Sequence, residues 1–223
     1  MMEAPVRIPC GPVTLDGDLS LPRNAQGIVV FAHGSGSSRL SPRNRQVART
    51  LCDAGLATLL FDLLTRPEEG QDALTGHLRF NIPFLSRRLV EVTGWLKQNE
   101  DLKALNVGYF GASTGAAAAL MAAAELPEVV KAIVSRGGRP DLAARSLPRI
   151  TAPTLLIVGG EDDQVIPLNQ DAFDALPGEK QLVLIPGATH LFEEPGALEE
   201  VARLARDWFL KHLVPEGKGK PAL

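Results

Sequence analysis

The 223-residue sequence lacks an excess of basic residues and lacks long apolar runs. Its 23 Lys and Arg stand against 26 Asp and Glu, which leaves a formal net charge of −3 and no basic footprint for nucleic acid. The wholly apolar runs, such as residues 28–32, are far shorter than the roughly 20 residues that a membrane helix requires. We therefore expect neither nucleic acid nor a membrane among the binding partners.

Cysteine is also scarce. Cys10 and Cys52 are too few for a disulfide scaffold and lack the spacing of a metal site. The N-terminal stretch MMEAPVRIPCG has no basic segment followed by an apolar core, so no signal peptide is predicted. Both observations favour a cytoplasmic protein. Length and composition predict a single domain over residues 1–223, in which residues 214–223 form a loosely ordered tail. The sequence does not predict the oligomeric state.

Short runs rich in Val, Ile and Leu alternate with helical patterns along the chain. We predict strands at 13–21, 27–32, 57–63, 106–110, 130–135, 154–158 and 181–185. We predict helices at 42–54, 82–98, 114–125, 168–176 and 196–213. This alternation is typical of an α/β fold with a doubly wound, mostly parallel sheet that is buried on both faces.

The first segments, up to residue 21, have no helix between them. They predict an antiparallel hairpin at one edge of the sheet, with a turn near residues 10–12. In such sheets ligands bind at the C-terminal ends of the strands, so the reactive residues are expected directly after each apolar run.

A nucleophile candidate follows the strand 106–110. Residues 111–115 read GASTG, which is G-x-S-x-G between a strand and an Ala-rich helix. The chain must pack closely on both sides of such a turn, which leaves space only for small residues two positions before and after Ser113. The N-terminus of the following helix also favours a developing anion. A serine that merely caps the helix is the structural alternative.

An acidic loop and a histidine follow two later strands, in the chain order Ser, acid, His that is expected of a triad on this fold. The loop after 154–158 reads GGEDDQVIP, and the segment after 181–185 ends at His190. His190 is predicted to be the general base, and Asp163 the carboxylate that holds its tautomer. Asp162 is the alternative, because spacing does not decide which neighbouring side chain faces the histidine.

The glycine-rich run HGSGSS after the strand 27–32 can turn backbone N–H groups toward the nucleophile. We predict an oxyanion hole made by the backbone N–H groups of Ser35 and Thr114. His33, at the start of this run, is expected to have a structural role, with its ring hydrogen-bonded to neighbouring backbone.

Several arginines also follow strands and should lie toward the catalytic edge of the sheet. Arg39, Arg43, Arg136 and Arg139 are candidates for binding an anionic group of the substrate, and surface ion pairs are the alternative. The polar stretch 65–80 is predicted to be a long loop that forms one wall of the site.

These motifs resemble the α/β-hydrolase superfamily and, within it, the dienelactone-hydrolase-like group, over roughly residues 13–213. The resemblance is carried by HGSGSSR at 33–39, GASTG at 111–115, GGEDDQVIP at 159–167 and GATH at 187–190. Together with SPRNR and SRGGRPDL, these motifs also resemble a subgroup of bacterial hydrolases sometimes joined to a phosphoribosyltransferase domain, which the 223 residues do not include. In the family the acid lies in a D-x-x-[VI]-P pattern, which implies Asp163.

Dienelactone hydrolases proper have a cysteine nucleophile and a glutamate directly after the histidine of the oxyanion loop. This chain has Ser113 and Gly34 at those positions, so the resemblance implies a serine-dependent esterase. We expect it to hydrolyse a small carboxylic ester through an acyl-enzyme, without metal or cofactor and without a large lid. A catalytically silent fold that binds a ligand or protein, and an acyltransferase, thioesterase or peptidase with the same triad, remain alternatives because fold does not decide function.

Overall fold

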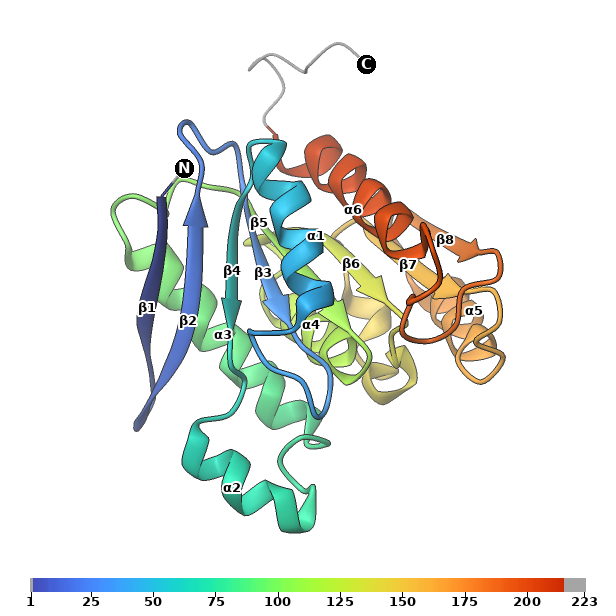
Figure 1. The fold of residues 1–223 in the computed structure, drawn as a ribbon, viewed down its shortest axis with the longest axis horizontal. Helices are drawn as coiled ribbons and strands as arrows, with labels where there is room; N and C mark the ends of the chain where they lie inside the picture. Colours follow the sequence, from blue (N-terminus) through green and yellow to red (C-terminus); the bar gives the residue numbers. More distant parts are fainter. Residues whose placement is uncertain (1, 215–223) are drawn as a thin grey trace.

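The computed structural model describes residues 2–214 and contains an eight-stranded sheet (Figure 1). The strand order is β1-β2-β4-β3-β5-β6-β7-β8. The strands are β1 (Met2–Cys10), β2 (Val13–Leu21), β3 (Ile28–Ala32), β4 (Ala57–Phe61), β5 (Val107–Ala112), β6 (Val130–Arg136), β7 (Thr154–Gly159) and β8 (Lys180–Ile185). From β4 to β8 all neighbours are parallel, whereas β1 and β2 are antiparallel at the N-terminal edge. Both features confirm the predicted sheet. The predicted tail, apart from Val214, lies outside the described residues.

Two layers of helices cover the sheet (Figure 1). The helices are α1 (Pro42–Asp53), α2 (Arg66–Thr75), α3 (Ile82–Gln98), α4 (Thr114–Glu125), α5 (Ile166–Ala175) and α6 (Ala197–Leu213), with short 3-10 turns η1 (Pro140–Ala143) and η2 (Leu147–Arg149). Helices α1 and α6 pack with one face of the sheet, and α3, α4 and α5 with the other. Strands β3, β4, β5 and β7 are buried along their whole length, as their continuous apolar sequences predict. No helix within residues 2–214 has the length and apolarity to cross a membrane.

The N-terminal hairpin turns where it was predicted. Cys10 pairs with Val13 across the turn, and Gly11 has a φ of +54°. Glycine adopts this left-handed conformation without a steric penalty, which is why it occupies such tight hairpin turns.

The stretch 65–80 differs from the predicted loop, because most of it forms α2. Thr65 begins the helix with a capping box: the Glu68 N–H donates to Thr65 Oγ1, and the Thr65 N–H donates to Glu68 Oε2 at 2.7 Å. Gly76, with a φ of +67°, ends it. This short helix lies beyond the C-terminal ends of β3 and β4 (Figure 1) and, within the described residues, there is no large lid.

Candidate active site

Ser113 lies on a sharp turn between β5 and α4, with a φ of +51° and a ψ of −122°. Few non-glycine residues adopt this conformation, and such strain persists where the surrounding structure enforces it, often at active sites. The surroundings here are very close: a Cβ on Gly115 would collide with the carbonyl oxygens of Ala32 and His33. A Cβ on Gly111 would likewise collide with the backbone of Ala116. The predicted strand–turn–helix context is confirmed, together with its steric reason.

The main chain of Ser113 is held by the last residue of β6 and by the segment that follows it. Its N–H donates to the carbonyl of Arg136 at 3.2 Å, and its own carbonyl accepts from the N–H of Arg139 at 3.2 Å. On the other side lies the loop after β3, where a Cβ on Gly34 would be 3.2 Å from the Cβ of Ser113. Ser113 is therefore fixed between the C-terminal ends of β3 and β6, the two strands that flank β5.

The carboxylate beside His190 belongs to Asp162, which corrects the prediction of Asp163. His190 Nδ1 is 2.6 Å from Asp162 Oδ2, and the Asp162 side chain is only 10% exposed. Asp163 is exposed. The turn decides between them: the Glu161 N–H donates to the carbonyl of Ala188 at 2.9 Å, which draws the acidic loop against the histidine segment with Asp162 facing it.

Gly137 connects the surroundings of His190 with those of Ser113. A Cβ on Gly137 would be 3.5 Å from His190 Cε1, and Gly137 directly follows Arg136, whose carbonyl accepts the Ser113 N–H. Within residues 2–214 no hydrogen bond joins Ser113 Oγ to the imidazole. Such catalytic hydrogen bonds are often long before substrate binds, so this geometry is compatible with a nucleophile and its base.

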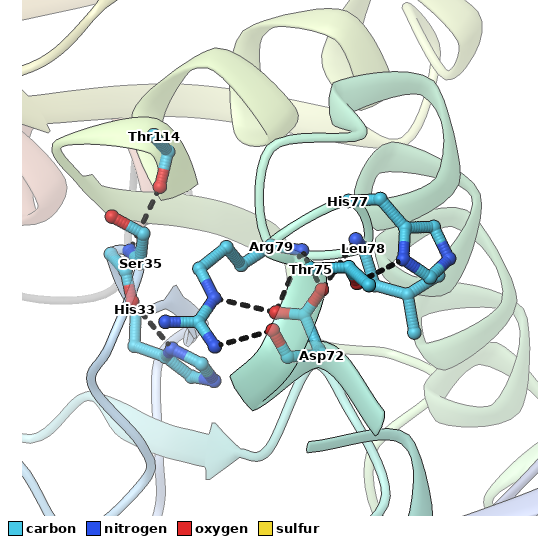
Figure 2. Close-up of polar contacts among 9 residues, drawn as sticks. His33, Ser35, Asp72, Thr75, His77, Leu78, Arg79 and Thr114 are labelled. Atoms are coloured by element: carbon cyan, nitrogen blue, oxygen red, sulfur yellow. Dashed lines mark hydrogen bonds and ion pairs between the residues drawn. The ribbon is translucent and has the colours of Figure 1, made fainter. Parts of the chain in front are cut away.

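The loop after β3 brings together the two residues predicted to form an oxyanion hole (Figure 2). The Ser35 N–H donates to Thr114 Oγ1 at 2.9 Å, so this donor is already engaged by the first residue of α4. His33 has the structural position that was expected. Its Nδ1 is 3.0 Å from the Gly34 carbonyl, and its Nε2 accepts the Leu63 N–H at 3.0 Å. Burial lowers the pKa of His33, which favours the neutral ring that these two contacts require.

A cavity of about 420 Å³ opens beside this loop. Its walls combine the polar loop after β3 with leucines and with three charged residues of the α2 region. They comprise residues 33–38, Leu40, Ser41, Pro42, Leu63, Leu64, Glu69, Asp72, Arg79, Leu85 and Thr114. Ser113 and His190 are not part of these walls, so the cavity adjoins the nucleophile through Thr114. The stretch 65–80, predicted to form one wall of the site, supplies Glu69, Asp72 and Arg79 to the walls of this cavity.

Arg79 is the cavity arginine, and it is not among the residues predicted from the sequence. Figure 2 shows its guanidinium held by Asp72: Nε donates to Asp72 Oδ2 at 2.5 Å, and Nη2 donates to the Asp72 carbonyl at 2.9 Å. Within the described part of the chain Nη1 has no hydrogen-bond partner. Burial of Asp72 acts to raise its pKa, but hydrogen bonds from the Arg79 side chain and from the N–H groups of Leu78 and Arg79 outweigh it and lower that pKa.

The four arginines that were predicted as candidate substrate contacts lie outside the cavity walls. Three of them form ion pairs: Arg39 with Asp62 and Asp18, Arg43 with Glu193, and Arg139 with Asp141. Arg136 is buried, and its guanidinium lies over the ring of Phe192. Three of the four arginines therefore form ion pairs, as the alternative interpretation of the sequence expects.

No group of three or more His, Cys, Asp or Glu side chains within residues 2–214 is arranged to hold a metal ion.

Comparison with known proteins places the chain among hydrolases. A crystal structure of a dienelactone hydrolase from Anabaena variabilis ATCC 29413 is 61% identical, with a TM-score of 0.94, over 95% of this chain and 98% of that one. Est1E from Butyrivibrio proteoclasticus shares the fold at 17% identity, with a TM-score of 0.79 over 93% of this chain and 98% of that one.

Two curated proteins of Mycobacterium tuberculosis, from strains CDC 1551 / Oshkosh and ATCC 25618 / H37Rv, are 58% identical over 217 residues. Both are provisionally named phosphoribosyl transferases. The match covers 97% of this chain and 48% of each relative, so the chain spans about half of their length. The model of the dienelactone hydrolase family matches residues 15–212. The chain is therefore an α/β hydrolase and belongs to the dienelactone hydrolase family.

Proposed function

We propose that this chain is a serine esterase that cleaves a small carboxylic ester through an acyl-enzyme. The observation that carries the proposal is the pairing of His190 with Asp162 at the same edge of the sheet as Ser113 on its strained turn. A serine hydroxyl is a weak nucleophile until a neighbouring base removes its proton, and a carboxylate holds that base in the required tautomer. These three groups supply those roles.

In the proposed reaction Ser113 Oγ attacks the ester carbonyl carbon while His190 Nε2 takes the hydroxyl proton. Asp162 accepts a hydrogen bond from the Nδ1–H of His190, keeps its charge, and stabilises the imidazolium that forms. The tetrahedral intermediate then expels the alcohol, which takes the proton from His190. A water molecule, deprotonated by His190, attacks the acyl carbon of the acyl-enzyme. The second tetrahedral intermediate then collapses, the bond from the acyl carbon to Ser113 Oγ breaks, and His190 returns the proton to Ser113 Oγ as the acid leaves. The steps balance without a metal or a cofactor.

The oxyanion of the intermediate is assigned to the backbone N–H groups of Thr114 and Ser35. Thr114 begins α4, where backbone N–H groups lack acceptors within the helix. The Ser35 N–H is held by Thr114 Oγ1 at 2.9 Å, so it must be shared with, or released to, the oxyanion as the substrate binds. Thr114 thus supplies one donor through its backbone N–H and holds the other, the Ser35 N–H, through its side-chain oxygen.

The cavity supports a small substrate with one polar or anionic end. Its volume of about 420 Å³ lies at the lower end of the range for small-molecule sites. Leu63, Leu64 and Leu85 supply an apolar wall, and Arg79 supplies a guanidinium whose Nη1 has no hydrogen-bond partner within residues 2–214. A guanidinium fixed by a buried carboxylate is well suited to a substrate carboxylate.

The direct test is replacement of Ser113 by Ala, with hydrolysis of p-nitrophenyl acetate and labelling by a fluorophosphonate probe as the two readouts. Wild type should hydrolyse the ester and take one label, and the variant should do neither while keeping its thermal unfolding midpoint. A wild-type protein that is inert in both assays would indicate a silent fold. A panel of esters, thioesters and amides would separate an esterase from a thioesterase or peptidase, and added alcohols would reveal acyl transfer.

The name of the M. tuberculosis relatives assigns no activity to residues of this chain. Their shared part coincides with the hydrolase-family match, and it is about half of each relative. We further propose a cytoplasmic location, supported by two buried cysteines in free thiol form.

A further inference from the structure

Arg136, the last residue of β6, has a buried charged side chain. The residue is only 7% exposed, and its Nε has no hydrogen-bond partner within residues 2–214. Burial, and secondarily the charge of Arg43, lowers its pKa to about 10. A buried guanidinium without a carboxylate is costly unless some other group compensates for the lost hydration.

The group that faces this guanidinium is the ring of Phe192. The central carbon of Arg136 lies 5.6 Å from the ring centroid, within the range of a cation–π contact. Phe192 is 1% exposed and has a φ of +55°, a conformation that is rare for a bulky side chain. Strain of this kind survives only where packing enforces it. Phe192 is two residues after His190 in the sequence, so a contact with its ring is also a contact with the histidine loop.

The main chain of Arg136 acts on the nucleophile. Its carbonyl accepts the Ser113 N–H at 3.2 Å. The next residue, Gly137, has a φ of +52°, and a Cβ there would meet both the Phe192 ring at 3.4 Å and His190 Cε1 at 3.5 Å. One residue thus holds the serine through its backbone and the histidine loop through its side chain.

We propose that Arg136 is a positioning residue that couples the serine turn to the histidine loop through its contact with Phe192. This inference rests on the proposed esterase function. Arg136 touches neither the substrate nor the reacting atoms; it sets the distance between Ser113 and the ring of His190. Its effect should therefore appear in kcat, because misplacement of a catalytic base weakens the transition state more than substrate binding.

A second contact to the same loop serves as a control. Arg43 Nη1 lies 2.8 Å from Glu193 Oε1, and the Glu193 side chain is 64% exposed. Exposed ion pairs contribute little, so Glu193→Gln should leave kcat unchanged. A cation–π contact far from the site is the matched chemical control: Lys180 Nζ lies 4.9 Å from the Phe173 ring at the opposite end of β8, and Lys180→Met should also leave kcat unchanged.

The experiment compares Arg136→Met, Arg136→Lys, Phe192→Leu and the Arg136→Met/Phe192→Leu double variant. In Arg136→Met the new side chain has a length similar to that of the arginine but carries no charge. In Phe192→Leu the new side chain is still apolar but has no aromatic face. We expect Arg136→Met and Phe192→Leu each to lower kcat for p-nitrophenyl acetate roughly three- to thirty-fold with an unchanged KM. The double variant should be no slower than either single variant, and lysine should restore most of kcat.

The readouts separate this proposal from the esterase assignment. A wild-type kcat in Arg136→Met, or a double variant whose losses multiply, would overturn the positioning role while the Ser113 assays still stand. The low-field proton resonance of His190 Nδ1, hydrogen-bonded to Asp162, gives a readout that needs no activity. It should shift or broaden in Arg136→Met and stay unchanged in Glu193→Gln. An unchanged resonance in both would also overturn the proposal, even if the wild type proved inert toward esters.

Discussion

Replacing Asp162 by Asn tests the identity of the triad carboxylate, and Asp163 next to it provides a matched control. The substitution keeps the size of the side chain and removes its charge. Asp162 Oδ2 lies 2.6 Å from His190 Nδ1, and the side chain is largely buried. The imidazolium formed during catalysis would therefore lose a close, poorly screened negative charge.

The expected loss follows from this geometry. With charge centres about 4 Å apart and an effective dielectric constant of about 20, the attraction is about 4 kcal/mol. Because about 1.4 kcal/mol corresponds to a factor of ten, the charge alone accounts for roughly a 10³-fold loss in kcat. An asparagine can also favour the wrong tautomer of the histidine, which brings the expected loss to about 10⁴-fold.

The assay is steady-state hydrolysis of p-nitrophenyl acetate, with Ser113→Ala as the background. Asp163→Asn should change kcat by less than about threefold, because the exposed carboxylate is solvated and its charge is screened. KM should stay near the wild-type value in both variants. An Asp162→Asn variant that keeps its rate while Asp163→Asn loses it would refute the assignment of Asp162.

Three further outcomes are expected. Arg79→Lys should raise KM for a half-ester of a short dicarboxylic acid several-fold, and leave KM for a neutral ester of equal length unchanged; equal effects on both would exclude a direct contact. Cys10 is buried with its pKa raised to about 12 by burial and by Glu91, so its thiol should react with a disulfide reagent at pH 8 only after denaturation. Fast labelling of native protein would contradict this packing. Gly115→Ala should lower the thermal unfolding midpoint by several degrees, since the added methyl group meets two carbonyl oxygens; an unchanged midpoint would mean that the turn relaxes freely.

The sheet could be predicted from the sequence because its strands are buried on both faces. Few folds other than a parallel sheet covered by helices can bury continuous Val, Ile and Leu runs that are separated by helical patterns. In such a sheet the residues that follow each parallel strand lie at the same edge, the C-terminal edge. This rule places Ser113 and His190 at that edge, and the G-x-S-x-G motif and the chain order Ser, acid, His identify them as candidates. Their strands, β5 and β8, are separated in the sheet by β6 and β7, and the loops cross that distance at the C-terminal edge.

Helix α2 could not be found by apolar periodicity, because Asp72 is the residue that it buries most completely. Its sequence signal is of another kind: Thr65 and Glu68 have the spacing of a capping box, with Pro67 in the first turn. Arg79 could not be predicted as a cavity residue for a related reason. Its direction depends on a carboxylate seven residues earlier, which faces it only once α2 has formed.

The choice between Asp162 and Asp163 shows a limit of reasoning from spacing. Adjacent side chains in a turn point in different directions, and a tertiary hydrogen bond decides which one faces the histidine. Here that bond runs from the Glu161 N–H to the carbonyl of Ala188, in a segment that lies 27 residues further along the chain. A D-x-x-[VI]-P pattern describes the turn without describing this contact.

The two sides of the site are built in different ways, and this difference has a consequence for substrate preference. The reactive groups stand at strand ends where backbones lie very close together, as the collisions of a Cβ at Gly111 and Gly115 show. Substitutions there must disturb the packing of the sheet. The opposite wall comes from α2 and the turn after it. Glu69 lines the cavity from the helix, which has its own N-terminal cap, and Arg79 lines it from the turn, which Asp72 holds to the helix. Because that wall contains neither Ser113 nor His190, we expect substitutions in it to change the KM for different esters more than they change kcat.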